Sequence, residues 1–361
     1  MVRVLVADDS ALMRKTLKAI FASDPEITVV GAARDGEDAV LKARELRPDV
    51  ITMDVNMPRL DGITALQHIV HEKICPVVMV SSLTQEGAAT TFEALELGAF
   101  DFVAKPGGTV SCNLHEVAGE LIAKVKAAAR LGQRPRLKER LASPRRAAPA
   151  PVAGTASGGP MKAVAMGIST GGPKVIYEVL PLLPRGLNAA FFLVQHMPPN
   201  FTSTYVKRLA EACQLPVVEA EAGMQVVPGT VYVGRGGRHL TLVKNAAGKV
   251  VIRLPSTPHH LFVPSVGVMM ESVLAVYGKR TVGVMMTGMG SDGADAMVAI
   301  RRAGGFTIAE SEESAIVWGM PGETVKRGGA DLVVPIWDIA REICRAVGSN
   351  AQARVAGGGA Q

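Results

Sequence analysis

Strand-length apolar runs that alternate with helical patterns constrain the fold of this chain more than any other feature. The first five runs are Val2–Ala7, Thr28–Val30, Val50–Met53, Val77–Val80 and Asp101–Val103. Segments between them, such as Ser10–Phe21 and Glu37–Leu46, space Leu, Ile, Ala and Val as one face of a helix requires. Five such strand–helix units predict an α/β domain, a doubly wound five-stranded parallel sheet with helices on both faces.

The same alternation resumes after residue 160, in the runs Ala163–Met166, Ala189–Val194 and Val282–Met286. We therefore expect a second α/β domain, doubly wound and Rossmann-like, with a mostly parallel sheet. Between the two series, Pro, Ala, Gly and Arg show no periodicity and cannot bury enough surface to offset chain entropy. The predicted organisation is a first domain over 1–130, a flexible basic linker over 131–160, a second domain over 161–347 and a disordered tail over 348–361.

The net charge of +6 raises the question of nucleic-acid binding. From Lys105 to Pro160 there are ten Lys or Arg against three Glu, and no aromatic residue is interleaved with them. A solvated linker fits this pattern better than a surface that reads bases. No nucleic-acid partner is therefore expected.

Membrane insertion and secretion are not expected either. Lys, Arg, Asp or Gly interrupts every apolar run before it reaches the roughly 18 residues that a membrane span needs. The first strand ends in acids and shows no signal-peptide cleavage site. The four cysteines (Cys75, Cys112, Cys213 and Cys344) are widely spaced, without CxxC pairs. This spacing indicates free thiols in the cytoplasm rather than a disulfide framework or a zinc site.

Charged residues stand at the ends of the predicted strands of the first domain. Asp8 and Asp9 follow the first strand, Asp54 follows the third, and Lys105 follows the fifth. In a doubly wound sheet, ligands bind outside the carboxyl ends of the strands, so these groups are expected to converge. Crowded carboxylates repel one another unless a hard cation joins them, and oxygen-only ligands suit Mg²⁺.

The first domain resembles a response-regulator receiver domain over residues 1–127. The resemblance rests on Asp8-Asp9, the string Met53-Asp54-Val55-Asn56-Met57-Pro58, Asp61-Gly62, Ser81 and Lys105-Pro106. It implies that Asp54 accepts a phosphoryl group from a histidine kinase. Asp9, Asp54 and the backbone carbonyl of Asn56 would hold Mg²⁺, with Asp8 assisting through water.

The same resemblance implies a switch that responds to the phosphoryl group. Lys105 would contact the phosphoryl oxygens, ahead of a cis bond to Pro106. Ser81 would hydrogen-bond the new phosphate, and Phe102 would rotate inward.

In the second domain, three strand ends carry a serine, a histidine and an aspartate. Ser169 lies in the glycine-rich turn Gly167–Gly172, His196 follows a strand directly, and Asp292 lies in another glycine-rich turn, where it opens the next helix. Parallel strands would bring the three to one edge of the sheet, as acyl transfer requires. Ser169 would be the nucleophile, His196 the base and then the acid, and Asp292 the group that fixes the imidazole tautomer.

The surroundings of the serine suggest further roles. A helical pattern from Pro173 to Leu180 would place Ser169 at the positive end of a helix. Backbone N–H groups of the glycine-rich turns, including that of Met289, would hold the oxyanion, and Thr170 would position the serine or the histidine. On its own, the turn is equally compatible with a capping serine. The order Ser, His, Asp is not that of α/β-hydrolases, so that fold is not predicted.

At these residues the whole chain resembles the chemotaxis protein-glutamate methylesterases of the CheB family. The matching segments are Gly167–Gly172, Val194-Gln-His-Met-Pro198 and Thr287-Gly-Met-Gly-Ser-Asp-Gly-Ala294, with weaker support from Trp318–Pro321 and from Gly-Gly-Arg238-His239-Leu240. The resemblance implies hydrolysis of glutamate γ-methyl esters on chemoreceptors, deamidation of receptor glutamines, and no cofactor for this chemistry. One segment departs, since Val263–Gly267 stands where the family often has Arg-Pro-Ser-Val-Asp.

The sequence leaves two other functions open for the second domain. A response regulator with a DNA-binding output has only the basic linker in its favour, and residues 161–347 show no helix-turn-helix pattern. A catalytically silent, phosphorylation-dependent scaffold is the second. Among the other histidines, we expect His239 to be structural, and His259-His260 is a candidate for lining a substrate groove.

Overall fold

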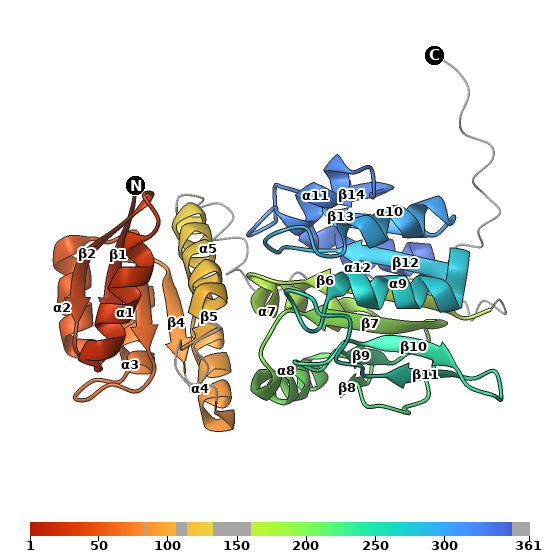
Figure 1. Ribbon diagram of the computed structural model, residues 1–361, viewed down its shortest axis with the longest axis horizontal. Coiled ribbons are helices and arrows are strands. Elements are labelled where there is room, and N and C mark those ends of the chain that lie inside the picture. The colour runs from red at the N-terminus through yellow and green to blue at the C-terminus, as the bar shows by residue number, and fades with distance from the viewer. Residues whose placement is uncertain (82–83, 106–113, 133–159, 349–361) are drawn as a thin grey trace, which may run out of the picture. The chain divides into compact units, whose positions relative to one another are not determined.

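The computed structural model describes residues 1–81, 84–105, 114–132 and 160–348, and the chain divides into two compact units (Figure 1). Residues 133–159 of the predicted linker, residues 349–361 of the predicted tail and Pro106 lie outside the described residues. The predicted domain boundaries therefore stay predictions.

The first unit is built on a parallel five-stranded sheet with the order β2-β1-β3-β4-β5. Its strands are β1 (Val2–Ala7), β2 (Ile27–Ala33), β3 (Val50–Asp54), β4 (Val77–Ser81) and β5 (Asp101–Ala104). Its helices are α1 (Ala11–Ala22), α2 (Gly36–Leu46), α3 (Gly62–His71), α4 (Gln85–Glu96) and α5 (Leu114–Gly132). All five predicted strands are confirmed, and β2 extends beyond the expected Thr28–Val30.

Local sequence explains these elements. Every residue of β3 and β4 is buried, and both strands are accordingly apolar except at Thr52 and at their last residues, Asp54 and Ser81. Several helices begin at a polar cap, because the Ser10, Asp35 and Asp61 side chains accept hydrogen bonds from the backbone N–H three residues on.

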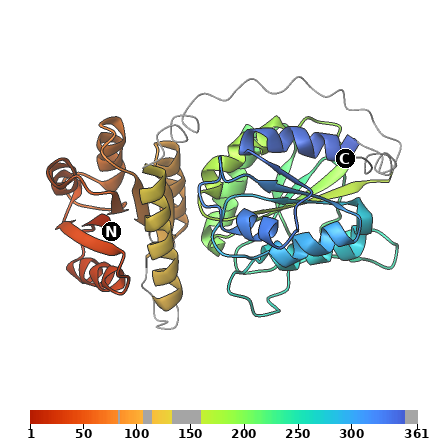
Figure 2. The same ribbon diagram turned by 90° about the horizontal axis from the view of Figure 1, so that it is seen from above.

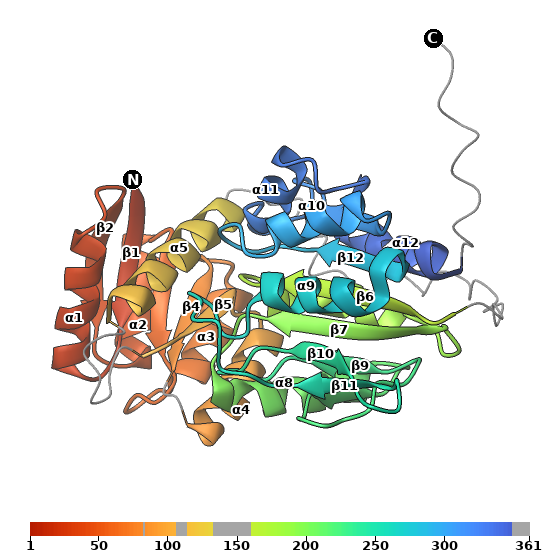
Figure 3. The same cartoon turned by 45° about the vertical axis from the view of Figure 1, so that its right-hand side comes forward.

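The second unit holds a seven-stranded sheet with the order β14-β13-β12-β6-β7-β9-β8, and all its strand pairs are parallel. These strands are β6 (Lys162–Ile168), β7 (Ala189–Gln195), β8 (Val217–Glu219), β9 (Val231–Val233), β12 (Thr281–Met285), β13 (Phe306–Glu310) and β14 (Leu332–Val334). The strands β10 (Thr241–Lys244) and β11 (Val250–Arg253) form a separate antiparallel hairpin (Figure 3). The hairpin packs against the helix α9 (Val266–Tyr277). The predicted fold class is confirmed.

Helices cover both faces of this sheet. They are α7 (Gly172–Val175), α9 (Val266–Tyr277), α10 (Ala294–Arg302), α11 (Met320–Lys326) and α12 (Ile336–Gly348). A further helix, α8 (Pro199–Ala212), is divided between the units, because Met197–Tyr205 group with the first unit and the residues from Val206 with the second. Seen from above, α12 lies on one side of the sheet and α9 and α10 on the other (Figure 2). Between the sheet and α9 lies an apolar core of Ala, Val, Met, Phe and Tyr side chains, which includes Phe192, Met269 and Met285.

Two local predictions were wrong. The segment after Ser169 is no continuous helix, since the four-residue α7 is followed by 3₁₀ turns at Ile176–Glu178 and Leu180–Leu182. Pro181 has no N–H and disfavours helical backbone at the residue before it. The sequence also predicts that Asn200 caps a helix from about Phe201 to Ala212, but Asn200 lies inside α8, which begins at Pro199.

The order of the strands sets the place of a site. β6 is the first strand of this unit, with β7 on one side and β12 on the other. Successive strands are added on one side of β6 up to β9 and on its other side from β12 onward, so the strand order reverses at β6. Ligands of doubly wound folds bind at the carboxyl ends of the strands at such a point.

Candidate active site

Ser169 directly follows the last residue of β6. Its N–H donates to the carbonyl of Thr287, in the turn after β12, over 2.9 Å. The chain then turns at Gly171, whose φ is +75° and where a Cβ would meet the Ile316 Cδ1 at 2.7 Å. A side chain at Gly171 would be strained and crowded, so glycine is needed for the turn that presents the serine hydroxyl.

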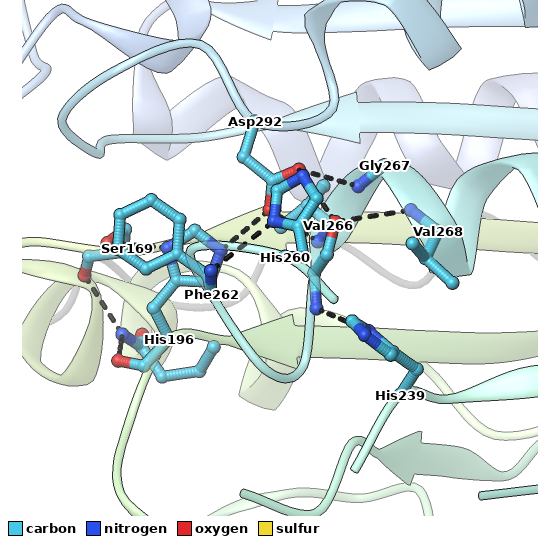
Figure 4. Close-up of polar contacts among 11 residues, drawn as sticks. Ser169, His196, His239, His260, Phe262, Val266, Gly267, Val268 and Asp292 are labelled. Carbon is cyan, nitrogen blue, oxygen red and sulfur yellow. Dashed lines mark hydrogen bonds and ion pairs between the residues drawn. The ribbon is translucent and has the colours of Figure 1, made fainter. Parts of the chain in front are cut away.

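His196 joins the serine to the aspartate (Figure 4). Its Nδ1 lies 3.0 Å from the Ser169 Oγ, and its Nε2 lies 2.9 Å from the Asp292 Oδ2. A carboxylate only accepts, so Nε2 carries the proton and Nδ1 is left as the acceptor for the hydroxyl. The structure thus brings together all three residues that the sequence singled out for acyl transfer.

Asp292 is held at the amino end of α9. Its carboxylate accepts hydrogen bonds from the Ser265 hydroxyl (2.8 Å), the Val266 N–H (2.7 Å) and the Gly267 N–H (3.0 Å). Burial by itself would raise the pKa of Asp292, but the hydrogen bonds and charge of His196, with the Ser265 and Gly267 donors, lower it to about 2. The group is therefore a carboxylate at neutral pH.

The expectation that Asp292 opens the following helix was wrong. That helix, α10, begins at Ala294, and its cap residue Gly293 makes no side-chain bond. The Asp292 carboxylate instead satisfies N–H groups at the start of α9, where unpaired donors and the helix dipole favour a negative charge.

The turn after β12 runs alongside the serine. A Cβ on Gly288 would lie 2.8 Å from the Ser169 Cβ, so only glycine permits this approach. Among the described residues no hydrogen bond uses the N–H of the next residue, Met289. That donor is available for an oxyanion. The Thr170 carbonyl accepts from the Thr287 hydroxyl (3.0 Å), and the predicted role of its side chain stays a prediction.

In the first unit, carboxylates also gather at strand ends. Asp8, Asp9 and Asp54 each offer an oxygen, and these atoms all lie within 4.8 Å of one another. The Lys105 Nζ lies 3.1 Å from the Asp8 Oδ2 and 2.7 Å from the Asp54 Oδ2. Burial raises the pKa of Asp54, and Lys105 opposes that effect. The predicted convergence is present, with a lysine as counter-ion.

The remaining receiver residues lie near this edge. The Ser81 hydroxyl donates to the Gly87 carbonyl in α4 over 3.3 Å, and the Phe102 ring packs edge-on against Phe92. The Lys124 Nζ lies 5.2 Å from the centre of the Phe102 ring. The carbonyl of Asn56 and the switch roles of Ser81 and Phe102 stay predictions.

The comparisons with known proteins agree with this geometry. Residues 164–343 match the CheB methylesterase family, and residues 4–112 match the response regulator receiver domain. A protein-glutamate methylesterase/protein-glutamine glutaminase of Syntrophomonas wolfei is 70% identical over 356 residues, which cover 96% of this chain and 99% of that protein. This chain belongs to the CheB methylesterase family.

Two further similarities support the same conclusion. The corresponding protein of Caldanaerobacter subterraneus is 48% identical and covers 97% of this chain. The crystal structure of the Thermotoga maritima CheB methylesterase catalytic domain has a TM-score of 0.50 at 36% identity, covering 51% of this chain and 98% of that one. The predicted family, the receiver domain and the methylesterase class are thus confirmed. No helix of the described residues is long and apolar enough to cross a bilayer.

Within this CheB-family site, sequence analysis missed Gln195, the last residue of β7. Its side-chain amide donates to the carbonyls of Ser169 (3.0 Å) and His196 (3.1 Å), so one NH₂ group connects these two residues. A polar residue that ends an apolar strand was the available signal.

Glu310 was missed as well, at the end of β13. It is fully buried, and its carboxyl accepts from the Thr287 N–H (2.7 Å) and the Ser314 hydroxyl (2.8 Å). Burial raises the pKa of Glu310 to about 7. Because the Thr287 carbonyl accepts a hydrogen bond from the Ser169 N–H, this acid supports the backbone beside Ser169.

The candidate groove histidines differ in their contacts. The His260 Nε2 lies 3.8 Å from the Asp292 Oδ1, whereas His259 makes no hydrogen bond or ion pair among the described residues. His239 is buried and structural, as expected, and its Nδ1 accepts the Ser265 N–H. The segment Val263–Gly267, which departs from the family pattern, lies beside Asp292, because the Gly267 N–H donates a hydrogen bond to the Asp292 carboxylate.

Proposed function

We propose that this protein hydrolyses γ-methyl esters of glutamyl residues on methyl-accepting chemoreceptors, and deamidates receptor glutamines, with Ser169, His196 and Asp292 as its catalytic residues. The observation that carries the proposal is the continuous contact from the Ser169 Oγ through both His196 ring nitrogens to the Asp292 carboxylate. It occurs in a chain that is 70% identical to a protein-glutamate methylesterase/protein-glutamine glutaminase.

The contacts support the following sequence of steps. The His196 Nδ1 takes the Ser169 hydroxyl proton as the oxygen attacks the ester carbonyl, and the oxyanion accepts the Met289 N–H. The carbonyl re-forms, the bond to the methoxy oxygen breaks, and His196 returns the proton so that methanol leaves. Water, deprotonated by His196, then hydrolyses the acyl-enzyme and regenerates the serine. An amide substrate follows the same steps with ammonia as the leaving group.

Asp292 stabilises the imidazolium without taking its proton. Its pKa of about 2 keeps it a carboxylate throughout, so the proton on the His196 Nε2 remains on nitrogen. The three donors of Ser265, Val266 and Gly267 hold the carboxylate in place before the reaction begins. Such preorganisation is a large part of electrostatic catalysis.

The receiver unit is proposed to regulate this activity. Asp54 would accept a phosphoryl group from a histidine kinase, and phosphorylation would raise the rate of ester hydrolysis. Asp8, Asp9 and Asp54 suit Mg²⁺, because they present only oxygen atoms, and these atoms lie close together. With the Asn56 carbonyl they would hold the ion, which when bound neutralises phosphoryl charge. Lys105 would bind a phosphoryl oxygen.

The proposal places the enzyme in the cytoplasm, with chemoreceptors as substrate, a histidine kinase as phosphodonor and no nucleic-acid partner. The direct test incubates purified full-length protein with methyl-labelled receptor, with and without a small phosphodonor and Mg²⁺, and counts the released methanol. We expect release that increases with the phosphodonor and disappears in Ser169→Ala.

Two results would contradict this proposal. Substantial release by Ser169→Ala would move the nucleophile elsewhere. No release by the wild type, together with failure of a serine-directed phosphonate to label Ser169, would favour a catalytically silent scaffold. Salt-dependent duplex binding at physiological ionic strength would instead revive a DNA-binding output.

A further inference from the structure

The Phe262 side chain lies against the catalytic histidine. Its ring is stacked on the His196 imidazole, with 4.1 Å between the ring centroids and 7° between the planes (Figure 4). The edge of the imidazole faces Ser169 and Asp292, so the stacked phenyl ring covers one of its two faces. None of the roles assigned above uses this contact.

The segment that carries Phe262 is fastened on both sides of that residue. Before it, the His239 N–H donates to the Pro255 carbonyl (2.8 Å), and the His239 Nε2 donates to the Pro258 carbonyl (2.9 Å). After it, the Val263 carbonyl accepts from Gly237 (2.9 Å). The buried His239, in the turn between β9 and β10, therefore fixes where this segment lies.

His260 links the same segment to the acid. Its Nδ1 accepts the Phe262 N–H over 3.3 Å, so in the neutral ring the proton lies on Nε2, which is 3.8 Å from the Asp292 Oδ1. The segment thus presents His260 to the catalytic aspartate and Phe262 to the catalytic histidine. Its position against the acid–base pair is set by these polar contacts and not by burial of Phe262 alone.

We propose that Phe262 is a positioning residue for His196, which keeps the imidazole in line between Ser169 and Asp292 and stabilises its protonated form. The inference rests on the proposed role of His196 as the base. A cation within about 6 Å of the centre of an aromatic ring, over its face, is attracted by the ring quadrupole. The imidazolium that forms during attack and breakdown lies in that position. Because the phenyl ring covers a face of the imidazole, it also opposes rotation of His196 away from the serine.

Other ionisable groups act on the same imidazole. Asp292 favours the imidazolium through its charge, a proton on His260 opposes it, and the Ser169 hydroxyl is neutral. Asp292 and His260 are the titratable side chains with a polar contact to His196 or to its carboxylate partner within the part of the chain that the structure describes. A Phe262 variant leaves all of them in place, so its effect isolates the aromatic ring.

The experiment compares full-length wild type with Phe262→Leu, Phe262→Tyr and Leu261→Ala. Leu261 is the exposed neighbour on the same segment and serves as the control. For each protein, kcat and KM for methyl-esterified receptor are measured across about pH 5 to 8, where histidine titrates. The rate of inactivation by a serine-directed phosphonate is measured over the same range, since it reports the serine–histidine pair without receptor binding.

We expect Phe262→Leu to lower kcat about 5-fold and to move the acid limb of both profiles to lower pH by about 0.7 pH unit, the equivalents of one cation–π contact of about 1 kcal/mol. The direction follows because protonated His196 cannot act as a base. Removing a group that stabilises the proton extends activity to lower pH. Phe262→Tyr should retain the wild-type limb and kcat, and Leu261→Ala should leave the limb unmoved.

A Phe262→Leu enzyme whose KM rises while its acid limb stays in place would overturn the inference and make Phe262 a substrate contact. A loss of kcat without movement of the limb, or a limb that moves equally in Phe262→Tyr, would also overturn it. Failure of the proposed function would look different. Wild type would then release no methanol, or Ser169→Ala would retain the rate, whatever stands at residue 262.

Discussion

Both units of this protein place carboxylates at the carboxyl ends of parallel strands, yet they hold the negative charge in different ways. In the receiver unit, burial raises the pKa of Asp54, and the countering positive charge is that of Lys105. In the esterase unit, the pKa of Asp292 is lowered to about 2 by hydrogen bonds from His196, Ser265 and the start of α9. One carboxylate has a cation for a partner, and the other is surrounded by fixed donors.

The difference fits the two proposed tasks. A phosphoacceptor has to change its charge and exchange its partners, so a lysine side chain that can move with the phosphoryl group is a suitable counter-ion. The acid of a triad has to keep its charge while a proton moves beside it, so backbone N–H groups that cannot leave are better suited. The carboxyl ends of the strands bring each carboxylate into a site, and the groups that donate hydrogen bonds to it determine its chemical role.

The largest expected effect separates the two carboxylates. Asp292→Asn should lower kcat for ester hydrolysis about 10⁴-fold, as expected when a triad loses the acid that sets the histidine tautomer. An asparagine amide would also point N–H groups at the donors of Ser265 or Gly267. The measurement is methanol release under saturating substrate.

Asp54→Asn is the matched control, with the same chemical change at the other sheet edge. It should leave the basal esterase rate within about 2-fold of wild type, since it lies outside the triad, and should abolish stimulation by a phosphodonor. Equal losses of the basal rate in Asp54→Asn and Asp292→Asn would contradict the different roles proposed for the two carboxylates.

Glu310 allows a test through stability. Its pKa rises from the ordinary 4.5 to about 7 in the folded protein, so the folded state keeps a proton that the unfolded state releases in this range. Protonated Glu310 therefore stabilises the folded state, and its contribution to the free energy of unfolding is complete below about pH 4.5. This contribution should fall by about 3 kcal/mol from pH 4.5 to pH 7. Glu310→Gln should remove this dependence, because the amide does not titrate.

Urea unfolding followed by tryptophan fluorescence measures this effect in the second unit, since both tryptophans (Trp318 and Trp337) belong to it. Above pH 7 the variant should be at least as stable as the wild type. A free energy that changes with pH in the same way in the wild type and in Glu310→Gln would contradict the raised pKa of Glu310.

A substitution of Gln195 tests whether its side-chain amide sets the distance between Ser169 and His196. Gln195→Met keeps the shape of the side chain but removes both donors to the carbonyls of Ser169 and His196. We expect kcat to fall about 10-fold with KM little changed, because hydrogen bonds of about 1 kcal/mol each are lost at a position that only orients the reacting pair. A variant that raises KM alone would assign Gln195 to substrate binding.

The smallest expected effect concerns the donors around Asp292. Ser265→Ala removes one of them and also the side-chain cap of α9. With Val266 and Gly267 still donating, kcat should fall only about 3- to 10-fold and the free energy of unfolding by about 1 kcal/mol. Ser265→Thr, which keeps the hydroxyl, should restore kcat. A loss as large as that of Asp292→Asn would show that the carboxylate depends on the hydroxyl rather than on the backbone.

Much of the site could be predicted from the chain because strand ends are visible in a sequence. Asp8, Asp54, Ser169 and His196 each directly follow an apolar strand or form its last residue, and parallel strands carry such residues to one edge. Asp292 was found in the same way, although its side chain turned out to cap α9 rather than α10. The direction of a short side chain in a turn depends on what lies opposite, which no local pattern records.

The sequence by itself determined the two α/β units, the family and the positions of Asp54, Ser169, His196 and Asp292, since hydrophobic periodicity and motif spacing are properties of neighbours along the chain. Only the tertiary structure decided which donors surround Asp292, that Gln195 and Glu310 support the nucleophile, and that Phe262 covers His196. These contacts join residues that are distant in sequence. They follow from the order β12-β6-β7 and from the path of connecting segments across that edge, and both are set by packing of the whole unit.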